Sequence, residues 1–178
     1  MERVFGKPLI TQKAIEKRVK ELGAQITTDY DGKDVLMICL LKGAYTFFAD
    51  LVRNVQLPVM VDFMMVSSYK DQSVSSGSVN IVQELTSSIE GKDVLLVEDI
   101  IDSGLTLDYI YQSLKAKKPD SLKFCVLLDK SERRRHEVPI EYLGFTIPNK
   151  FIIGYGLDYK DKYRNLPYIA VLDKSEVE

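Results

Sequence analysis

The sequence predicts an α/β domain whose central sheet is mainly parallel and covered by helices on both faces. Three short runs are apolar almost throughout, DVLMICLL (34–41), VLLVE (94–98) and FCVLLD (124–129). Such runs are typical of strands that are buried on both faces. Segments with apolar residues at helical spacing separate them, and this alternation of strands and helices is the pattern of a parallel sheet.

Composition limits the classes of protein that fit this chain. Its 178 residues suffice for one domain with a real core, and no repeat or linker divides residues 1–178. The net charge of −2 argues against a nucleic-acid surface as the main role. The longest apolar run, 35–41, is too short to span a bilayer, and the N-terminus has no apolar signal core. We therefore expect a cytoplasmic protein without nucleic-acid or membrane partners.

The first half of the chain predicts two helices and three strands. Thr11 is placed to cap a helix that we expect to end at Gly23. The strand at 34–41 precedes a second helix. After Pro58 we expect a long strand at 59–69, then a polar, Ser-rich loop at 70–78 and another strand at 78–85. The apolar positions that define the two helices are Ile15, Val19 and Leu22, and Ala44, Phe47, Phe48, Leu51, Val52 and Val55.

The second half continues the alternation. The strand 94–98 leads into an acidic turn, and a helix then follows and ends near Pro119. The strand 124–129 comes next, and 151–156 and 168–172 are further strand candidates. Cys39 and Cys125 lie inside apolar runs, so we expect buried free thiols in a reducing compartment. Two isolated Cys and a single His are too few to form a soft-metal cluster.

The most informative stretch is EDIIDSGLT (98–106), where a strand passes into a helix. Backbone N–H groups at Ser103, Gly104, Leu105 and Thr106 would point outward at the helix N-terminus, and this arrangement suits a phosphate group. Glu98 and Asp99 could accept hydrogen bonds from sugar hydroxyls or face Mg²⁺. A capped helix with acidic residues at its start is the plainer interpretation. The whole stretch nevertheless favours a phosphorylated sugar.

These residues also carry a resemblance to a known family. VLLVEDIIDSGLTL (94–107) resembles the phosphoribosyl-pyrophosphate signature of the purine phosphoribosyltransferases. The chain resembles the hypoxanthine-guanine phosphoribosyltransferases nearly end to end, through LLKGA (40–44), SSY (67–69), LLDK (127–130) and the block 145–169. The resemblance implies the type I phosphoribosyltransferase fold with a small hood subdomain. It also implies Mg²⁺-dependent transfer of the phosphoribosyl group to hypoxanthine or guanine, giving IMP or GMP plus pyrophosphate, and a homo-oligomer.

The resemblance further implies a role for each matching residue. Asp102 corresponds to the general base near N7 of the purine, and Lys130 to the donor to O6, which would reject adenine. Asp158 corresponds to a residue at the base edge and a second Mg²⁺. The residues that match the 5′-phosphate loop are Ser103, Gly104, Leu105 and Thr106, and those that match the pair at the ribose and Mg²⁺ are Glu98 and Asp99. Pyrophosphate is matched by Arg164 and by Lys42 and Gly43, which form a turn that in the family often holds a non-proline cis peptide. In the base pocket, Phe151 matches the residue that stacks on the base and Ile152 the one whose backbone contacts the base edge, while Ser68 and Tyr69 match the start of a mobile loop.

Three residues depart from the family's pattern, and some alternatives stay open. Ala44 stands where relatives often carry Gly or Ser, Leu105 stands where some carry Lys, and Lys70 stands where Gly is common. The run 133–135, three arginines followed by His136, could be an RNA contact, but a solvated turn is the commoner use of such a run. A regulatory sensor of phosphoribosyl pyrophosphate and a receiver-type phospho-acceptor domain are the rival functions. The receiver interpretation leaves the phosphate loop and the block 145–169 unexplained.

Overall fold

The computed structural model describes residues 6–68 and 79–172, so Tyr69 and Lys70 lie outside the described residues. Six strands form a central sheet in the order β4-β3-β2-β5-β6-β7, and three more form a small sheet in the order β1-β9-β8. In the central sheet every neighbouring pair is parallel except β3 with β4. The mainly parallel sheet that the sequence predicts is therefore confirmed.

The elements follow one another along the chain as strands alternating with helices. The strands are β1 (Lys7–Ile10), β2 (Val35–Leu41), β3 (Met60–Ser68), β4 (Val79–Gln83), β5 (Asp93–Ile101), β6 (Ser121–Asp129), β7 (Tyr142–Thr146), β8 (Ile152–Ile153) and β9 (Ile169–Val171). The helices are α1 (Gln12–Asp29), α2 (Tyr45–Asn54) and α3 (Leu105–Lys115), with a short 3₁₀ turn, η1 (Ser131–Arg133).

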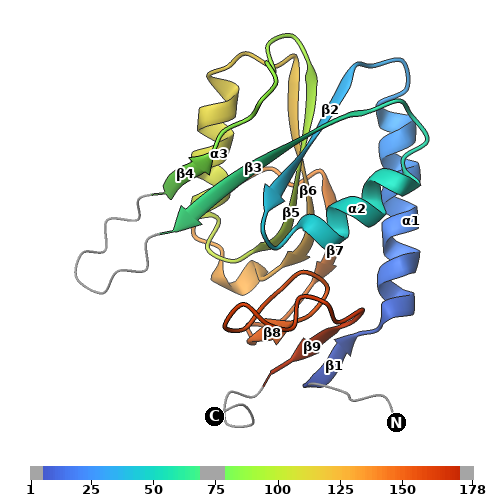
Figure 1. Cartoon of the computed structure of the whole chain (residues 1–178), viewed down its shortest axis with the longest axis vertical. Coiled ribbons are helices and arrows are strands. Elements are labelled where there is room, and N and C mark those ends of the chain that lie inside the picture. Colours follow the sequence, from blue (N-terminus) through green and yellow to red (C-terminus); the bar gives the residue numbers. More distant parts are fainter. Residues whose placement is uncertain (1–5, 69–78, 173–178) are drawn as a thin grey trace.

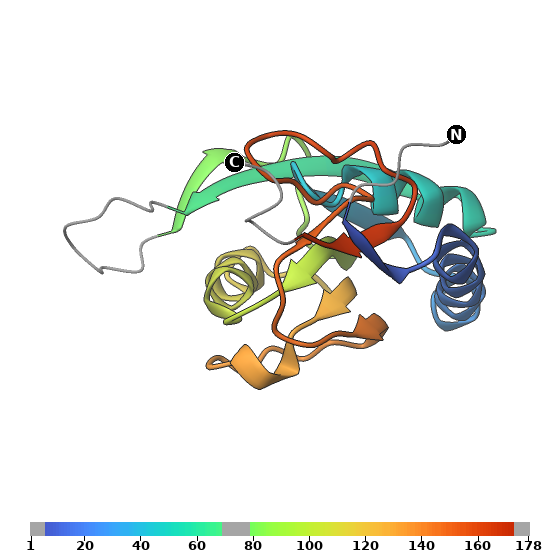
Figure 2. The same ribbon diagram turned by 90° about the horizontal axis from the view of Figure 1, so that it is seen from below.

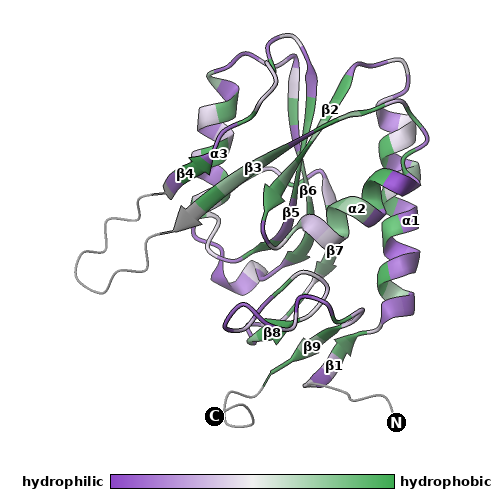
Figure 3. Ribbon diagram, in the orientation of Figure 1, coloured by the Kyte–Doolittle hydropathy of each residue, from purple (hydrophilic) through white to green (hydrophobic). Residues whose placement is uncertain are grey.

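Helices cover both faces of the central sheet, as the apolar runs predict. Alternate residues of β2 enter two separate cores: Met37 and Cys39 pack with α1 and α2, while Leu36 and Ile38 pack with α3. Figures 1 and 2 show α1 and α2 on one side of the sheet and α3 on the other. Figure 3 shows the green, apolar strands enclosed between helices whose outer faces are purple. Cys39 and Cys125 are buried and free, as expected.

Helix α1 is longer than the sequence pattern predicts, and Gly23 does not end it. The helix continues to Asp29, and Gly23 lies buried in its interior. A Cβ atom at Gly23 would lie 2.6 Å from the Asn54 carbonyl oxygen at the end of α2. The glycine therefore allows two helices to approach closely, which is a tertiary constraint that local sequence does not reveal.

Two strands were missed, β1 and β7, and both are short edge strands. β7 pairs with β6, and a Cβ at Gly144 would collide with the Leu127 carbonyl oxygen of β6. Arg18 of α1 donates to the Leu143 carbonyl at 2.6 Å and to the Gly144 carbonyl at 3.2 Å. These bonds satisfy backbone groups at the exposed edge of the sheet, a position that otherwise invites pairing with another chain.

Other strand boundaries shift for backbone reasons. β5 continues through Ile101, so Glu98 and Asp99 lie within the strand rather than in a turn after it. The predicted strand 151–156 shrinks to Ile152–Ile153 because Gly154, Tyr155 and Gly156 all have positive φ angles, of 97°, 50° and 101°. Such angles turn the chain away from an extended conformation.

The small sheet lies beyond the ends of the parallel strands. In Figure 1, β1, β8 and β9 sit below the arrowheads of β2 and β5. This sheet lies where the resemblance implies a small hood subdomain. Among the described residues, none of the helices has the length and apolar content needed to cross a bilayer.

A buried carboxylate, Asp62 on β3, fixes the loop that leads into β5. It accepts hydrogen bonds from the backbone N–H groups of Phe63, Thr86 and Ser87 at 2.8–2.9 Å, and from the Thr86 hydroxyl at 3.1 Å. Burial raises the pKa of the Asp62 carboxyl, but these four donors outweigh burial and hold the pKa below its usual range. The ionised form is therefore part of the folded structure.

We expect Asp62→Asn to lower the free energy of unfolding by about 2–3 kcal/mol at pH 7, because an amide nitrogen would face some of these donors. The pKa in the folded state is depressed, so the stabilisation is present above the unfolded pKa of about 4 and is lost as the pH falls through the folded value. Urea unfolding between pH 7 and pH 3 measures both effects. Asp34→Asn, at a 73% exposed carboxylate, is the control; equal losses in the two variants would contradict the prediction.

Candidate active site

The turns that follow three parallel strands lie together at one edge of the central sheet. β2 is followed by Lys42 and Gly43, β5 by Asp102 and Ser103, and β6 by Lys130. Because parallel strands end at the same edge, residues that are far apart in sequence meet there. The small sheet lies opposite this edge (Figure 1).

The turn after β2 is packed tightly on both sides. The Leu41–Lys42 peptide bond is cis, in the turn where the resemblance implies such a bond. A Cβ at Gly43 would collide with the Asp99 carboxylate of β5. A Cβ at Gly156, whose φ is 101°, would collide with the Gly43 carbonyl oxygen. The turn is therefore held between β5 and the loop that follows β8, and only glycine fits at both contacts.

A cavity of about 680 Å³ opens beside this turn. It brings together five of the residues that the sequence predicts for the site, from three separate segments of the chain. Its lining consists of Leu41, Lys42, Gly43, Met65, Val66, Val82, Asp99, Asp158, Asp161 and Arg164. Two cations and three carboxylates thus face one space, which suits a highly charged ligand such as pyrophosphate together with a divalent cation.

Arg164 connects this cavity to the hood loop. Its guanidinium lies 2.7 Å from Asp158 Oδ1 and donates to the Gly156 carbonyl oxygen at 2.7 Å. Asp161, which the sequence gave no reason to select, lies 3.5 Å from Arg164 and 3.8 Å from Lys42 Nζ. The Asp161 carboxylate therefore lies between the two cations that the resemblance assigns to pyrophosphate.

Glu98 and Asp99 occupy neighbouring positions of β5 but different environments. Asp99 lines the cavity, and its carboxylate accepts a hydrogen bond from the Ile100 N–H at 2.8 Å. Glu98 is buried and accepts from the Asp99 N–H at 2.9 Å. Burial, and then the neighbouring Asp99 charge, raises the pKa of Glu98 well above its usual range. Burial, and then the charges of Glu98 and Asp99, raise the pKa of the nearby Cys39 thiol to about 12.

The turn between β5 and α3 has the form of an anion site. Gly104 has a φ of 85° and precedes Leu105, the first residue of α3. A glycine is required there because a Cβ would crowd the His136 carbonyl oxygen. Leu105 and Thr106 lie in the first turn of α3, where backbone N–H groups have no partner within the helix. The backbone N–H groups of Arg135 and His136 donate to the Ser103 carbonyl at 2.9 and 3.1 Å, and these two bonds tie the turn to the segment that follows β6.

Asp102 faces two cations from the segment after β6. Lys130 Nζ lies 3.9 Å from Asp102 Oδ2, and Arg133 contacts both carboxylate oxygens, at 3.1 and 3.2 Å. Burial lowers the pKa of the Lys130 ammonium, the Arg133 charge lowers it further and the Asp102 charge opposes both. Arg134 pairs with the buried Asp129 at 2.8 Å. The interpretation of the arginine run as a solvated turn is therefore wrong for Arg134, which pairs with a buried carboxylate. Arg133 is exposed and also pairs with Asp102.

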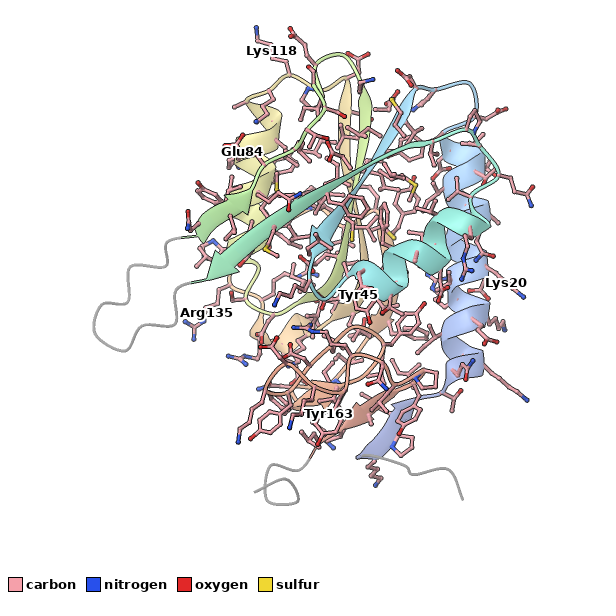
Figure 4. The ribbon with its side chains drawn as sticks, viewed as in Figure 1. Lys20, Tyr45, Glu84, Lys118, Arg135 and Tyr163 are labelled. Atoms are coloured by element: carbon pink, nitrogen blue, oxygen red, sulfur yellow. The ribbon has the colours of Figure 1, made fainter. Side chains whose placement is uncertain are left out.

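The remaining predicted residues lie around the hood. Phe151 is 38% exposed and meets the Tyr159 ring edge-on, with 5.5 Å between ring centroids. Ile152 is buried in β8, where it pairs with Val171. Ser68 is the last residue of β3. In Figure 4, Tyr45 lies on α2 and Tyr163 lies in the hood region below it, while Arg135 points outward from the ribbon.

The carboxylates present fit a magnesium ion that shares its ligands with substrate. Within residues 6–68 and 79–172, no group of three or more His, Cys, Asp or Glu side chains is placed to hold a metal alone. Asp99 and Asp158 nevertheless line one cavity. Mg²⁺ is usually held by one or two carboxylates together with substrate phosphates and water, so two carboxylates beside a phosphate site suit it.

Comparison with known proteins agrees with this geometry. The phosphoribosyl transferase domain family matches residues 8–160. The chain is 46% identical over 178 residues to hypoxanthine-guanine phosphoribosyltransferase of Bacillus subtilis, covering 100% of this chain and 99% of that protein. It also resembles the crystal structure of a hypoxanthine phosphoribosyltransferase from Staphylococcus aureus, with a TM-score of 0.92, 44% identity, and coverage of 97% of this chain and 94% of that one.

A third similar structure bears on assembly. The hypoxanthine phosphoribosyl transferase of Trypanosoma cruzi, solved in work on the role of its C-terminal region in oligomeric state and activity, has a TM-score of 0.92 and 43% identity. The match covers 99% of this chain and 96% of that one.

Because Asp161 lies between Lys42 and Arg164, it competes with any anion that those cations bind. We expect Asp161→Asn to tighten binding of pyrophosphate about two- to fivefold, the size of effect typical of exposed ion pairs. Isothermal titration calorimetry with pyrophosphate and Mg²⁺ measures it. Asp31→Asn, an exposed carboxylate before β2, makes the same change in net charge and is the control. Unchanged or weaker binding in Asp161→Asn would contradict the competition.

Proposed function

The chain belongs to the hypoxanthine-guanine phosphoribosyltransferases, and from this premise we propose how its residues share the work of the reaction. The reaction is a step of purine salvage. It transfers the 5-phosphoribosyl group of phosphoribosyl pyrophosphate to N9 of hypoxanthine or guanine, giving IMP or GMP and pyrophosphate. The observation that carries the residue assignment is the pairing of Lys130 with Asp102, 3.9 Å apart, beside the anion site at the start of α3.

Lys130 and Asp102 match the edge of a 6-oxopurine. On that edge O6 accepts a hydrogen bond, and the neighbouring N7 exchanges a proton. The Lys130 ammonium donates to O6 while Asp102 Oδ2 takes or shares the N7 proton as general base. Proton transfer to a positioned carboxylate lets the purine become a better nucleophile as the glycosidic bond forms.

The sugar phosphate extends from the base toward α3. Backbone N–H groups at Ser103, Gly104, Leu105 and Thr106, with the Ser103 and Thr106 hydroxyls, hold the 5′-phosphate, and the helix N-terminus adds favourable partial charge. The ribose then lies over Asp99, with Glu98 behind it. The carboxylate of Asp99 favours the positive charge that develops on the sugar as the bond to pyrophosphate breaks.

Pyrophosphate occupies the cavity between Lys42 and Arg164. These cations neutralise the charge that grows on the leaving group, and the Gly43 N–H is available beside them. Glu98, Asp99 and Asp158 are the residues proposed for magnesium, of which Asp99 and Asp158 line the cavity. When bound, Mg²⁺ supplies further electrostatic stabilisation to the departing phosphate oxygens.

The hood completes the base pocket. Phe151 offers a ring face for stacking, and the backbone at Ile152 reads the far edge of the purine. Ser68 and Tyr69 head the segment proposed to close over the site and exclude water, which would otherwise hydrolyse the sugar cation.

We also propose a single phosphoribosyltransferase domain over residues 1–178, because the central sheet and the loop between β8 and β9 both contribute lining to one cavity. A cytoplasmic location and a homo-oligomer are part of the same proposal. The oligomer is supported by the Trypanosoma cruzi relative, whose C-terminal region was studied for its role in oligomeric state.

Asp102→Asn is expected to lower kcat with hypoxanthine by about 10²–10⁴-fold, because an amide cannot take the N7 proton. Pyrophosphate release under saturating phosphoribosyl pyrophosphate measures it, and Asp120→Asn, an exposed residue before β6, is the control. Near-normal turnover in Asp102→Asn would remove Asp102 as the base. Binding of substrate by the wild-type protein without turnover of any base would favour a sensor instead.

Adenine presents an amine where hypoxanthine presents O6, so two donors would face each other at Lys130. We expect kcat/KM for adenine to be at least about a hundredfold below that for hypoxanthine. Lys130→Gln, whose amide offers both a donor and an acceptor, should narrow this ratio. Comparable rates with the two bases in the wild-type enzyme would show that Lys130 does not select the base.

A further inference from the structure

Arg133 makes an unusual contact for a surface arginine, because it grips both oxygens of a carboxylate at the candidate site. Its Nε lies 3.1 Å from Asp102 Oδ1, and its Nη1 donates to Asp102 Oδ2 at 3.2 Å. A planar guanidinium that meets both oxygens fixes the rotation of the carboxylate, which a single ammonium does not do.

The turn η1 makes this contact possible. The Arg133 N–H donates to the Lys130 carbonyl at 2.8 Å, and the Lys130 N–H donates to the Ile101 carbonyl at 3.0 Å. After β6 the chain therefore makes one short turn at Lys130, and this turn brings Arg133 back beside Asp102. Lys130 and Arg133 reach the same carboxylate from one side of the site.

The two oxygens of Asp102 are not equivalent. Oδ1 is shielded from solvent and makes no well-aligned hydrogen bond in the described structure, so the Arg133 Nε is the charge that compensates it. Oδ2 accepts from Arg133 Nη1 at 3.2 Å and lies 3.9 Å from Lys130 Nζ, and it is the oxygen that we assign to a purine N7. Without Arg133, Oδ1 would be a buried anionic oxygen without compensation, and the carboxylate would gain by turning away.

We propose that Arg133 is a positioning residue for 6-oxopurine recognition: it holds the Asp102 carboxylate so that Oδ2 meets N7 while Lys130 meets O6. This inference rests on the proposed roles of Asp102 and Lys130 and adds a third member to that group.

A purely structural role for Arg133 does not account for the contact. The Arg133 side chain is 50% exposed, and such surface ion pairs contribute little to folding. Its neighbours behave differently. Arg134 pairs with Asp129, whose side chain is 6% exposed, and Arg135 projects into solvent (Figure 4). The run 133–135 therefore divides into a site residue, a structural residue and a solvated residue.

The charged groups that face the Asp102 carboxylate within 4 Å, among the residues described, are Lys130 and Arg133. Near the start of α3, His136 pairs with Asp108 at 3.6 Å rather than with Asp102. Loss of the Arg133 charge would leave Asp102 with Lys130 alone. A neighbouring cation favours the charged form of a carboxylate, so this loss would remove part of the electrostatic support for the carboxylate.

The test compares Arg133→Gln, Arg133→Lys and the matched control Arg135→Gln, using steady-state kinetics with hypoxanthine from pH 5 to pH 9. We expect Arg133→Gln to lower kcat/KM for hypoxanthine about 10–100-fold, a loss typical of a misplaced catalytic group. The KM for phosphoribosyl pyrophosphate should change less than about twofold, and the acidic limb of the pH profile should move to higher pH.

The conservative variant separates charge from geometry. Arg133→Lys keeps the charge but not the two-point grip, so the acidic limb should return toward its wild-type position while kcat/KM recovers only in part. Arg135→Gln should match the wild type in all three readouts. Thermal unfolding of the variants shows whether any loss comes from the fold.

Two results would overturn the proposal. One is an unchanged kcat/KM and acidic limb in Arg133→Gln. The other is a loss equalled by Arg135→Gln. In either case inactivation by Asp102→Asn would leave the proposed function intact. Failure of the wild-type enzyme to turn over any 6-oxopurine would instead remove the proposed function itself.

Discussion

The parallel hydrogen bonding of β2, β5 and β6 is the constraint on which the candidate site depends. It brings the ends of three strands to one edge, so that Lys42, Asp102 and Lys130 become neighbours although they are far apart in sequence. Both faces of these strands are buried, and slipping the register would turn buried side chains toward the wrong core. Packing in the interior therefore sets distances among charged groups at the edge.

Much of this arrangement could be predicted, because its signals are local. Buried strands are apolar throughout, and the phosphate turn combines acidic, glycine and hydroxyl residues over one stretch, 98–106. The errors have tertiary causes. Gly23 is buried against Asn54 rather than at a helix end, and β7 becomes visible only through its pairing with β6. The partnership of Arg133 with Asp102 depends on where a short turn folds back, which the run of arginines does not reveal. The individual roles of the site residues stay predictions.

The crowding of Glu98, Asp99 and Asp102 is resolved in two different ways. Glu98 and Asp99 are adjacent and buried, and the raised pKa of Glu98 favours its neutral form, so the two carboxyls avoid full repulsion. Asp102 lies beside two cations, with Lys130 Nζ 3.9 Å from Oδ2 and Arg133 Nε 3.1 Å from Oδ1. The difference between the carboxyl pair and the third carboxylate lies in burial and in cation partners rather than in residue type.

At the contact between Gly43 and Gly156, two turns pack backbone against backbone. Neither backbone has room for even a methyl group, so a shift of one turn has to displace the other. Phe151 and Ile152 lead directly into the second turn, whereas Lys42 belongs to the first. A side chain at position 156 would fit only if the Gly43 turn moved, and that turn also carries Lys42 into the cavity. The position of Lys42 therefore depends on a glycine that lies more than a hundred residues away in sequence.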